Sequence, residues 1–266
     1  MKHLKIELRN EVQYVKLARP EKRNAFQPEM IAELTQVFKS SVELKARAIV
    51  LSGEGESFCA GGDLDWMKSM AKFSLEENKR DAQNLYDMYE AGRACPLPLL
   101  GRAHGHAMGG GLGLLAVCDI VVAEAKTLFS FSEVKWGLVP AVISSFVMEK
   151  MRPHRAREWM LTAKVFNAKE ARRAGLVHFE GFLTEIDEYL DKNIVLIKKA
   201  NPVAIAETKK LLHFLASNAH DKYREQCTKV IAERRVSPEG QAGLKAFLEK
   251  KPAPWAKSRR SRSPIG

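Results

Sequence analysis

Hydrophobic residues in the first half of the chain recur with two different periods. From Val12 to Leu17 apolar residues stand at every second position, which predicts a strand. Residues 29–42 instead have helical spacing, so we expect an amphipathic helix there. The apolar face of this helix consists of Met30, Ile31, Leu34, Val37 and Phe38. Residues 48–51 form a short apolar run that suits a buried strand.

The same two patterns continue further along the chain. Residues 64–71 and 75–93 indicate helices, and residues 99–103, 120–123 and 128–131 indicate strands. The connections between these strands are long enough for parallel pairing, which predicts an α/β fold for the first half. After about residue 182 nearly every segment has helical spacing; these segments are 183–199, 203–217, 221–235 and 237–247.

This change of pattern predicts three regions. Residues 1–200 would form the α/β core, residues 201–255 a helical region, and residues 256–266 a basic, disordered tail. No internal repeat or long Gly/Ser/Pro linker divides the chain.

Charge is the one unusual feature of the composition. The formal net charge is +11, and 45% of the 266 residues are hydrophobic. A positive surplus favours an anionic partner, such as a phosphorylated ligand or nucleic acid. No nucleic-acid-binding motif accompanies the charge, so nucleic-acid binding is the less favoured class. We expect no membrane association and no secretion, because there is no apolar run of about 18 residues and no signal-peptide core.

The four cysteines show no metal-binding spacing, and we expect reduced thiols, a cytoplasmic location and no metal site.

Three segments carry candidate chemistry. Residues 58–64 (FCAGGDL) place two glycines before Asp63, which suits a sharp turn followed by a capped helix. Residues 105–114 (GHAMGGGLGL) place three glycines before an apolar helix, and free backbone N–H groups at such a helix start would suit an anion or a developing oxyanion. In residues 131–140 (FSEVKWGLVP), Glu133 lies among small and apolar residues, and partial burial would raise its pKa and suit it to acid/base catalysis. Each segment alone has a purely structural interpretation.

Together with residues 17–26 (LARPEKRNAF), these segments resemble the crotonase, or enoyl-CoA hydratase/isomerase, superfamily. The resemblance extends from Leu4 to about Trp255. It implies a spiral of ββα units, a C-terminal helical trimerisation region, and homotrimers or hexamers. It also implies an acyl-CoA substrate and no separate cofactor, because coenzyme A is part of the substrate.

The resemblance also implies roles for individual residues. Ala60 and Gly110 match the two residues whose backbone N–H groups form the oxyanion hole, and Glu133 matches a catalytic glutamate. The residues expected to bind the acyl-CoA are Lys22, Arg23, Ala25, Ala60, Gly61, Gly62, Asp63, Leu64, Gly110 and Trp136.

One position departs from the family pattern. The best-known hydratases use two glutamates, and the second one falls at Gly113 in this chain. Three readings remain open. The chain is a hydratase in which Glu133 does most of the acid/base work, a Δ3,Δ2-enoyl-CoA isomerase with one base, or a divergent hydrolase or decarboxylase.

The runs around Asp63 and Glu133 look like bacterial methylglutaconyl-CoA hydratases of leucine degradation, which favours hydration. Such a substrate has a second carboxylate, for which Lys68, Lys72, Arg80 or Lys135 could supply the cation.

Overall fold

The computed structural model describes residues 1–40 and 45–256. These residues divide into two compact units, Met1–Lys192 and Asn193–Gly266, and helix α8 (Leu183–Lys199) crosses from the first into the second. The division at residue 200 that we expected from the sequence stays a prediction. The basic tail that we expected at 256–266 lies, from residue 257 on, outside the described residues.

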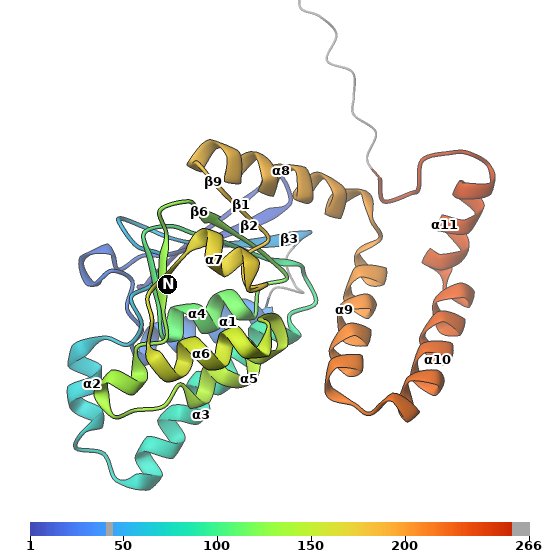
Figure 1. Cartoon of the computed structure of the whole chain (residues 1–266). Coiled ribbons are helices and arrows are strands. Elements are labelled where there is room, and N and C mark those ends of the chain that lie inside the picture. The colour runs from blue at the N-terminus through green and yellow to red at the C-terminus, as the bar shows by residue number, and fades with distance from the viewer. Residues whose placement is uncertain (41–44, 257–266) are drawn as a thin grey trace, which may run out of the picture. The chain divides into compact units, whose positions relative to one another are not determined.

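The first unit is built on a six-stranded sheet (Figure 1). Strands β1 (Leu4–Arg9) and β2 (Val12–Leu17) form an antiparallel hairpin, and the other strands add to β2 in parallel. The remaining strands, in the order of the sheet, are β3 (Ala48–Gly53), β4 (Leu99–Ala103), β6 (Ile120–Glu124) and β9 (Phe179–Gly181). Parallel neighbours need long crossovers, and the intervening helices supply them.

A smaller sheet consists of β5 (His106–Met108), β7 (Leu128–Ser130) and β8 (Phe166–Asn167). Strands β5 and β7 pair in parallel, and β8 is antiparallel to β7. Strand β5 leads directly into the glycine-rich helix α4, so this sheet places the candidate site.

Most helices of the first unit contribute buried apolar residues to its core. Helix α1 (Pro28–Ser40) buries the five apolar residues predicted to form its inner face. Helices α3 (Leu75–Ala94), α4 (Gly110–Ala116) and α5 (Ala141–Lys150) lie against one another (Figure 1). The other helices of this unit are α2 (Leu64–Met70), α6 (Pro153–Thr162) and α7 (Ala168–Arg173).

The second unit contains helices α9 (Pro202–Ser217), α10 (Tyr223–Val236) and α11 (Pro238–Leu248). The Ser237 side chain accepts a hydrogen bond from the Gly240 amide at the start of α11, as the sequence signal there predicts. Among the described residues, no helix combines the length and the apolar character needed to cross a bilayer.

The α/β fold of parallel strands and crossover helices is confirmed. Helices α5, α6 and α7, strand β1 and the short strands β5, β8 and β9 were not predicted.

Candidate active site

Two glycine-containing loops, residues 58–63 and residues 105–111, lie side by side in the first unit. The Cys59 amide donates to the His106 carbonyl at 3.1 Å, and the Met108 amide donates to the Cys59 carbonyl at 2.9 Å. A Cβ on Gly111 would stand 2.6 Å from the Cys59 oxygen, and a Cβ on Gly61 would stand 3.2 Å from the Met108 oxygen. Because backbone packs directly on backbone, side chains at these glycines would force the loops apart.

A third loop fixes the first of these two. The Ala60 amide donates to the Arg23 carbonyl at 3.0 Å, and the Phe26 amide donates to the Gly61 carbonyl at 2.7 Å. The Asp63 amide returns a bond to the Phe26 carbonyl at 2.8 Å. Residues 60–63 are therefore held to residues 23–26 by three main-chain hydrogen bonds.

A buried ion pair reinforces the same junction. The Arg19 guanidinium donates to Asp63 at 2.8 Å and to the Ala25 carbonyl at 2.6 Å. The other Asp63 oxygen accepts from the Asp65 amide at 2.8 Å and so caps helix α2. Burial alone would raise the pKa of Asp63, but the Arg19 hydrogen bond and the Asp65 amide outweigh it and hold the pKa below its ordinary value. The Asp63 carboxylate thus links the loop of residues 60–63 to Arg19 and to the start of helix α2.

The hydrogen bonds of these loops change one assignment. Because the Ala60 amide is engaged by Arg23, it cannot also serve as an oxyanion donor while the loop keeps this conformation. Within the described residues, neither the Gly62 amide nor the Gly110 amide makes a hydrogen bond. The structure therefore favours Gly62 over Ala60 as the partner of Gly110. Spacing in the sequence did not distinguish them, since the difference lies in where the Arg23 carbonyl points.

Glu133 lies against the glycine loop. It begins a short 3-10 turn, Glu133–Trp136, just after β7. A Cβ on Gly109 would stand 3.1 Å from the Glu133 Oε1 atom and would crowd the carboxylate, and the positive φ of 48° at this position also favours glycine. The Oε2 atom is buried and has no hydrogen-bond partner among the described residues. Burial raises the pKa of Glu133, and a hydrogen bond from its own backbone amide opposes this only in part.

No space remains beside Gly113 for a second carboxylate. A Cβ on Gly113 would stand 2.7 Å from Ile143 Cγ2 and 2.7 Å from Tyr89 Cζ. Tyr89 is fully buried, and its hydroxyl donates to the Gly110 carbonyl at 2.8 Å. Sequence reasoning missed Tyr89, because an aromatic residue on an amphipathic helix has no feature that separates it from ordinary core.

The other predicted acyl-CoA-binding residues lie around the first loop or on the surface. Lys22 is exposed and pairs with Asp65 at 3.0 Å, and this hydrogen bond raises the pKa of Lys22. Leu64 begins helix α2 with 72% of its surface exposed, and Trp136 is 71% exposed. Ala25 is buried at the junction with Arg19. Their role in binding stays a prediction.

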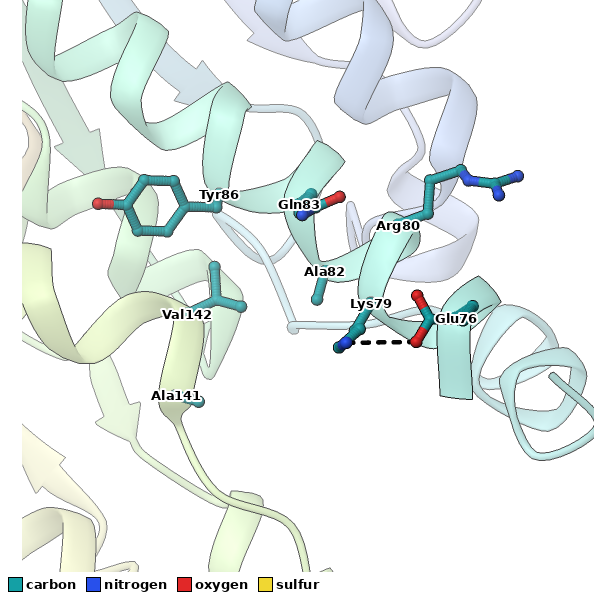
Figure 2. Close-up of a pocket in the computed structure, with 8 residues that line it drawn as sticks. All are labelled: Glu76, Lys79, Arg80, Ala82, Gln83, Tyr86, Ala141 and Val142. Atoms are coloured by element: carbon teal, nitrogen blue, oxygen red, sulfur yellow. Dashed lines mark hydrogen bonds and ion pairs between the residues drawn. The ribbon is translucent and has the colours of Figure 1, made fainter. Parts of the chain in front are cut away.

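A cavity of about 540 Å³ opens between α3 and α5 (Figure 2). Its lining consists of Glu76, Lys79, Arg80, Ala82, Gln83 and Tyr86 from α3, and Ala141 and Val142 from α5. Lys79 pairs with Glu76 at 3.2 Å, whereas Arg80 makes no ion pair within 4.0 Å among the described residues. Lys68, Lys72 and Lys135 are not part of this lining.

Cys59, in the first loop, is completely buried. Burial raises the pKa of its thiol to about 12, and a hydrogen bond with the Gly61 backbone opposes this only in part.

Residues 7–258 match the sequence model of the enoyl-CoA hydratase/isomerase family. The crystal structure of an enoyl-CoA hydratase from Shewanella pealeana is 35% identical, with a TM-score of 0.91 over 95% of this chain and 96% of its own. AtuE from Pseudomonas aeruginosa is 32% identical, with a TM-score of 0.92 over 96% and 100% of the two chains. The enoyl-CoA hydratase AKT6-1 of Alternaria alternata is 34% identical over 87% of this chain and 76% of its own length.

Proposed function

Because this chain belongs to the enoyl-CoA hydratase/isomerase family, we propose that it adds water across the 2,3 double bond of an enoyl-CoA thioester. The observation that carries the proposal is the Glu133 carboxylate. It has a raised pKa and one buried, unpartnered oxygen, and it packs against the glycine loop that also holds the Gly110 amide. These features support an acid/base role for Glu133 beside a candidate oxyanion donor.

In the proposed reaction the thioester oxygen accepts hydrogen bonds from the Gly62 and Gly110 amides. Carbonyl polarisation makes the β-carbon electrophilic, and each such donor is worth ~2.7–4 kcal/mol of barrier. Glu133 removes a proton from water as the hydroxyl adds to C3, and the electrons of the double bond move into an enolate. The protonated Glu133 then returns the proton to C2, so that one water is added in total.

This chemistry needs no cofactor beyond the CoA that the substrate carries. We propose that Lys22 and Arg23 meet the CoA phosphates. Both are exposed beside the loop that carries Gly62, and cations there complement the phosphate charges.

One panel of substrates tests the proposal: crotonyl-CoA, 3-methylglutaconyl-CoA and a 3-enoyl-CoA, with products identified by mass and proton NMR. We expect 3-hydroxyacyl-CoA products, one water heavier than the substrate, and their loss in Glu133→Gln with folding intact. Normal hydration by Glu133→Gln would contradict the mechanism.

A Δ3,Δ2-enoyl-CoA isomerase is the second candidate. It is supported by the filled space beside Gly113, because one carboxylate suffices to move a proton from C2 to C4. Conversion of the 3-enoyl-CoA into a 2-enoyl-CoA as the main activity, without gain of water, would favour the isomerase over the hydratase.

Within the hydratase proposal, 3-methylglutaconyl-CoA is the substrate that we put first. The cavity between α3 and α5 supports it, because it combines an apolar wall at Val142 with the cations Lys79 and Arg80. The same two helices carry Tyr89 and Ile143, the side chains packed beside Gly113. A carboxylate at the far end of the acyl group would pair with Arg80.

We therefore predict that Arg80→Gln raises KM for 3-methylglutaconyl-CoA at least about tenfold, the worth of one charged hydrogen bond. KM for crotonyl-CoA, which lacks the second carboxylate, should stay the same. Lys68→Gln is the control, since Lys68 is an exposed cation outside the cavity lining. Equal effects of Arg80→Gln on both substrates would remove this cavity from the proposal.

A further inference from the structure

The space beside Gly113 is occupied by two side chains from neighbouring helices. Besides the contact with Tyr89 Cζ, a Cβ on Gly113 would stand 2.9 Å from Tyr89 Cε1. These are atoms of a rigid aromatic ring, which cannot swing aside as a flexible chain end does. The glycine at 113 and the tyrosine at 89 are therefore sterically matched.

Surrounding rings fix the orientation of Tyr89. Phe26 meets it edge to face, with ring centroids 6.5 Å apart, and Phe146 packs on it at 5.5 Å. These contacts direct the phenol oxygen at the glycine loop. It bonds the Gly110 carbonyl at 2.8 Å and would stand 2.9 Å from a Cβ on Gly110.

The glycine loop needs such an anchor. Gly109, Gly110 and Gly111 are consecutive, and glycine has the greatest backbone freedom of any residue. The Gly109 amide is held by the Ser130 carbonyl at 3.0 Å, and the Gly109 carbonyl accepts from the Leu112 amide at 2.9 Å. On the other side of the Gly110 amide, the hydrogen bond from Tyr89 holds the next peptide group.

The phenol also keeps its proton. Burial raises the pKa of Tyr89 well above its ordinary value, and the nearby Cys59 and Glu133 groups raise it further. Tyr89 thus remains a hydrogen-bond donor whenever Glu133 is ionised.

We propose that Tyr89 is a positioning residue. Its ring fills the space beside Gly113, where the best-known hydratases have their second glutamate, and its hydroxyl holds Gly110 so that the Gly110 amide points at the thioester oxygen. This inference rests on the proposed function. Tyr89 acts through Gly110 and leaves Glu133 as the acid/base group.

The test uses the absorbance of bound cinnamoyl-CoA, because hydrogen bonds to its conjugated thioester carbonyl shift the absorbance to longer wavelength. In a Glu133→Gln background, where hydration cannot consume the probe, we expect a clear red shift. Adding Tyr89→Phe should reduce that shift, and Tyr89→Phe alone should lower kcat on the order of 10- to 100-fold, less than the loss of a whole donor. KM should change little, because the CoA contacts remain.

Two further variants guard against an effect on folding alone. Tyr223→Phe removes a phenol-to-carbonyl hydrogen bond to Leu215 in the second unit, so it is a matched control and should change neither the red shift nor kcat. Gly113→Ala adds a Cβ that must displace the Tyr89 ring, so it should reduce the red shift as Tyr89→Phe does.

An unchanged red shift and kcat in Tyr89→Phe would overturn the proposal, as would a lower melting temperature with the red shift intact. The absence of any red shift in the Glu133→Gln background would overturn the proposed thioester binding and this inference together. A clear red shift in Glu133→Gln that stays the same after Tyr89→Phe is added would contradict only the role of Tyr89 and would leave the proposed thioester binding standing.

Discussion

Glu133, the acid/base group of the proposed reaction, lies in an environment that disfavours its charge. Burial raises its pKa, so the carboxylate takes up a proton at higher pH than an ordinary glutamate. If the ionised form accepts the proton from water, kcat/KM should fall on the acid side at a pH above the ordinary glutamate pKa. A pH profile of kcat/KM measures this limb directly.

The same shift has a consequence for stability. Between the pKa of the unfolded chain and the raised pKa of the fold, the folded state binds more protons, so stability falls as pH rises through this window. We predict that Glu133→Gln stabilises the protein at neutral pH and has less effect below the unfolded pKa. Thermal melts of both proteins at pH 4 and pH 7 test this, and an equal melting-temperature difference at the two pH values would contradict it.

Substitution by alanine should have very different effects at two glycines of the candidate site. A Cβ on Gly110 would stand 2.8 Å from the Phe26 ring, whereas the nearest atom to a Cβ on Gly62 is Met67 Cγ at 3.5 Å, an ordinary contact. We predict that Gly110→Ala destabilises the protein by about 1–3 kcal/mol and strongly reduces turnover. Gly62→Ala keeps its backbone amide and should retain both stability and turnover. Urea unfolding measures the stability of each variant, and initial rates measure its turnover.

The roles predicted for Glu133 and Gly110 stay predictions. The structure places Glu133 against Gly109, the neighbour of Gly110, but the amide of Ala60 is already bonded to Arg23. A main-chain donor leaves no signature in residue type, because every residue except proline has the same amide. Only the folded loop reveals that the Ala60 amide is bonded while the Gly62 amide makes no hydrogen bond within the described residues.

At the scale of elements, the long amphipathic segments were predictable and the short ones were not. Helix α3 matches the predicted 75–93 closely and begins with a capping box between Ser74 and Glu77. Helix α5 was missed because its apolar residues surround most of its circumference, and strands β5, β8 and β9 are two or three residues long. Such strands exist only through their partners, which local sequence does not specify.

The junction between η1 (Pro20–Lys22) and α2 depends on the Arg19–Asp63 ion pair. Removing Arg19 leaves a buried carboxylate without its partner, so we predict that Arg19→Met destabilises the protein by about 3 kcal/mol. Lys22→Met breaks only the exposed pair with Asp65 in the same junction and should cost much less than Arg19→Met. Equal losses of unfolding free energy in urea would contradict the assignment.

At the scale of the whole molecule, the family and the α/β fold predicted from the sequence are confirmed. The net charge of +11 fits an anionic partner, and CoA phosphates are the partner that the proposed function supplies. Assembly into trimers or hexamers stays a prediction, because it depends on contacts between copies.

We predict a mass of three or six times the 29.9 kDa of the chain in sedimentation equilibrium. Several large apolar side chains of the first unit lie exposed on η3 (Glu133–Trp136), on the segment that follows it and on α6, and contact with another copy would cover such surface; they include Trp136, Leu138, Val139 and Leu161. A concentration-independent mass of 29.9 kDa would exclude both assemblies.

The burial of Cys59 has a consequence for what becomes of the acyl group. Its sulfur lies close to the loop proposed to bind the thioester. An ionised thiol there could undergo thiol–thioester exchange, releasing CoA and keeping the acyl chain on Cys59. With a pKa of about 12, it stays protonated at neutral pH, and a protonated thiol is a poor nucleophile. Substrate and product would thus both leave as CoA esters.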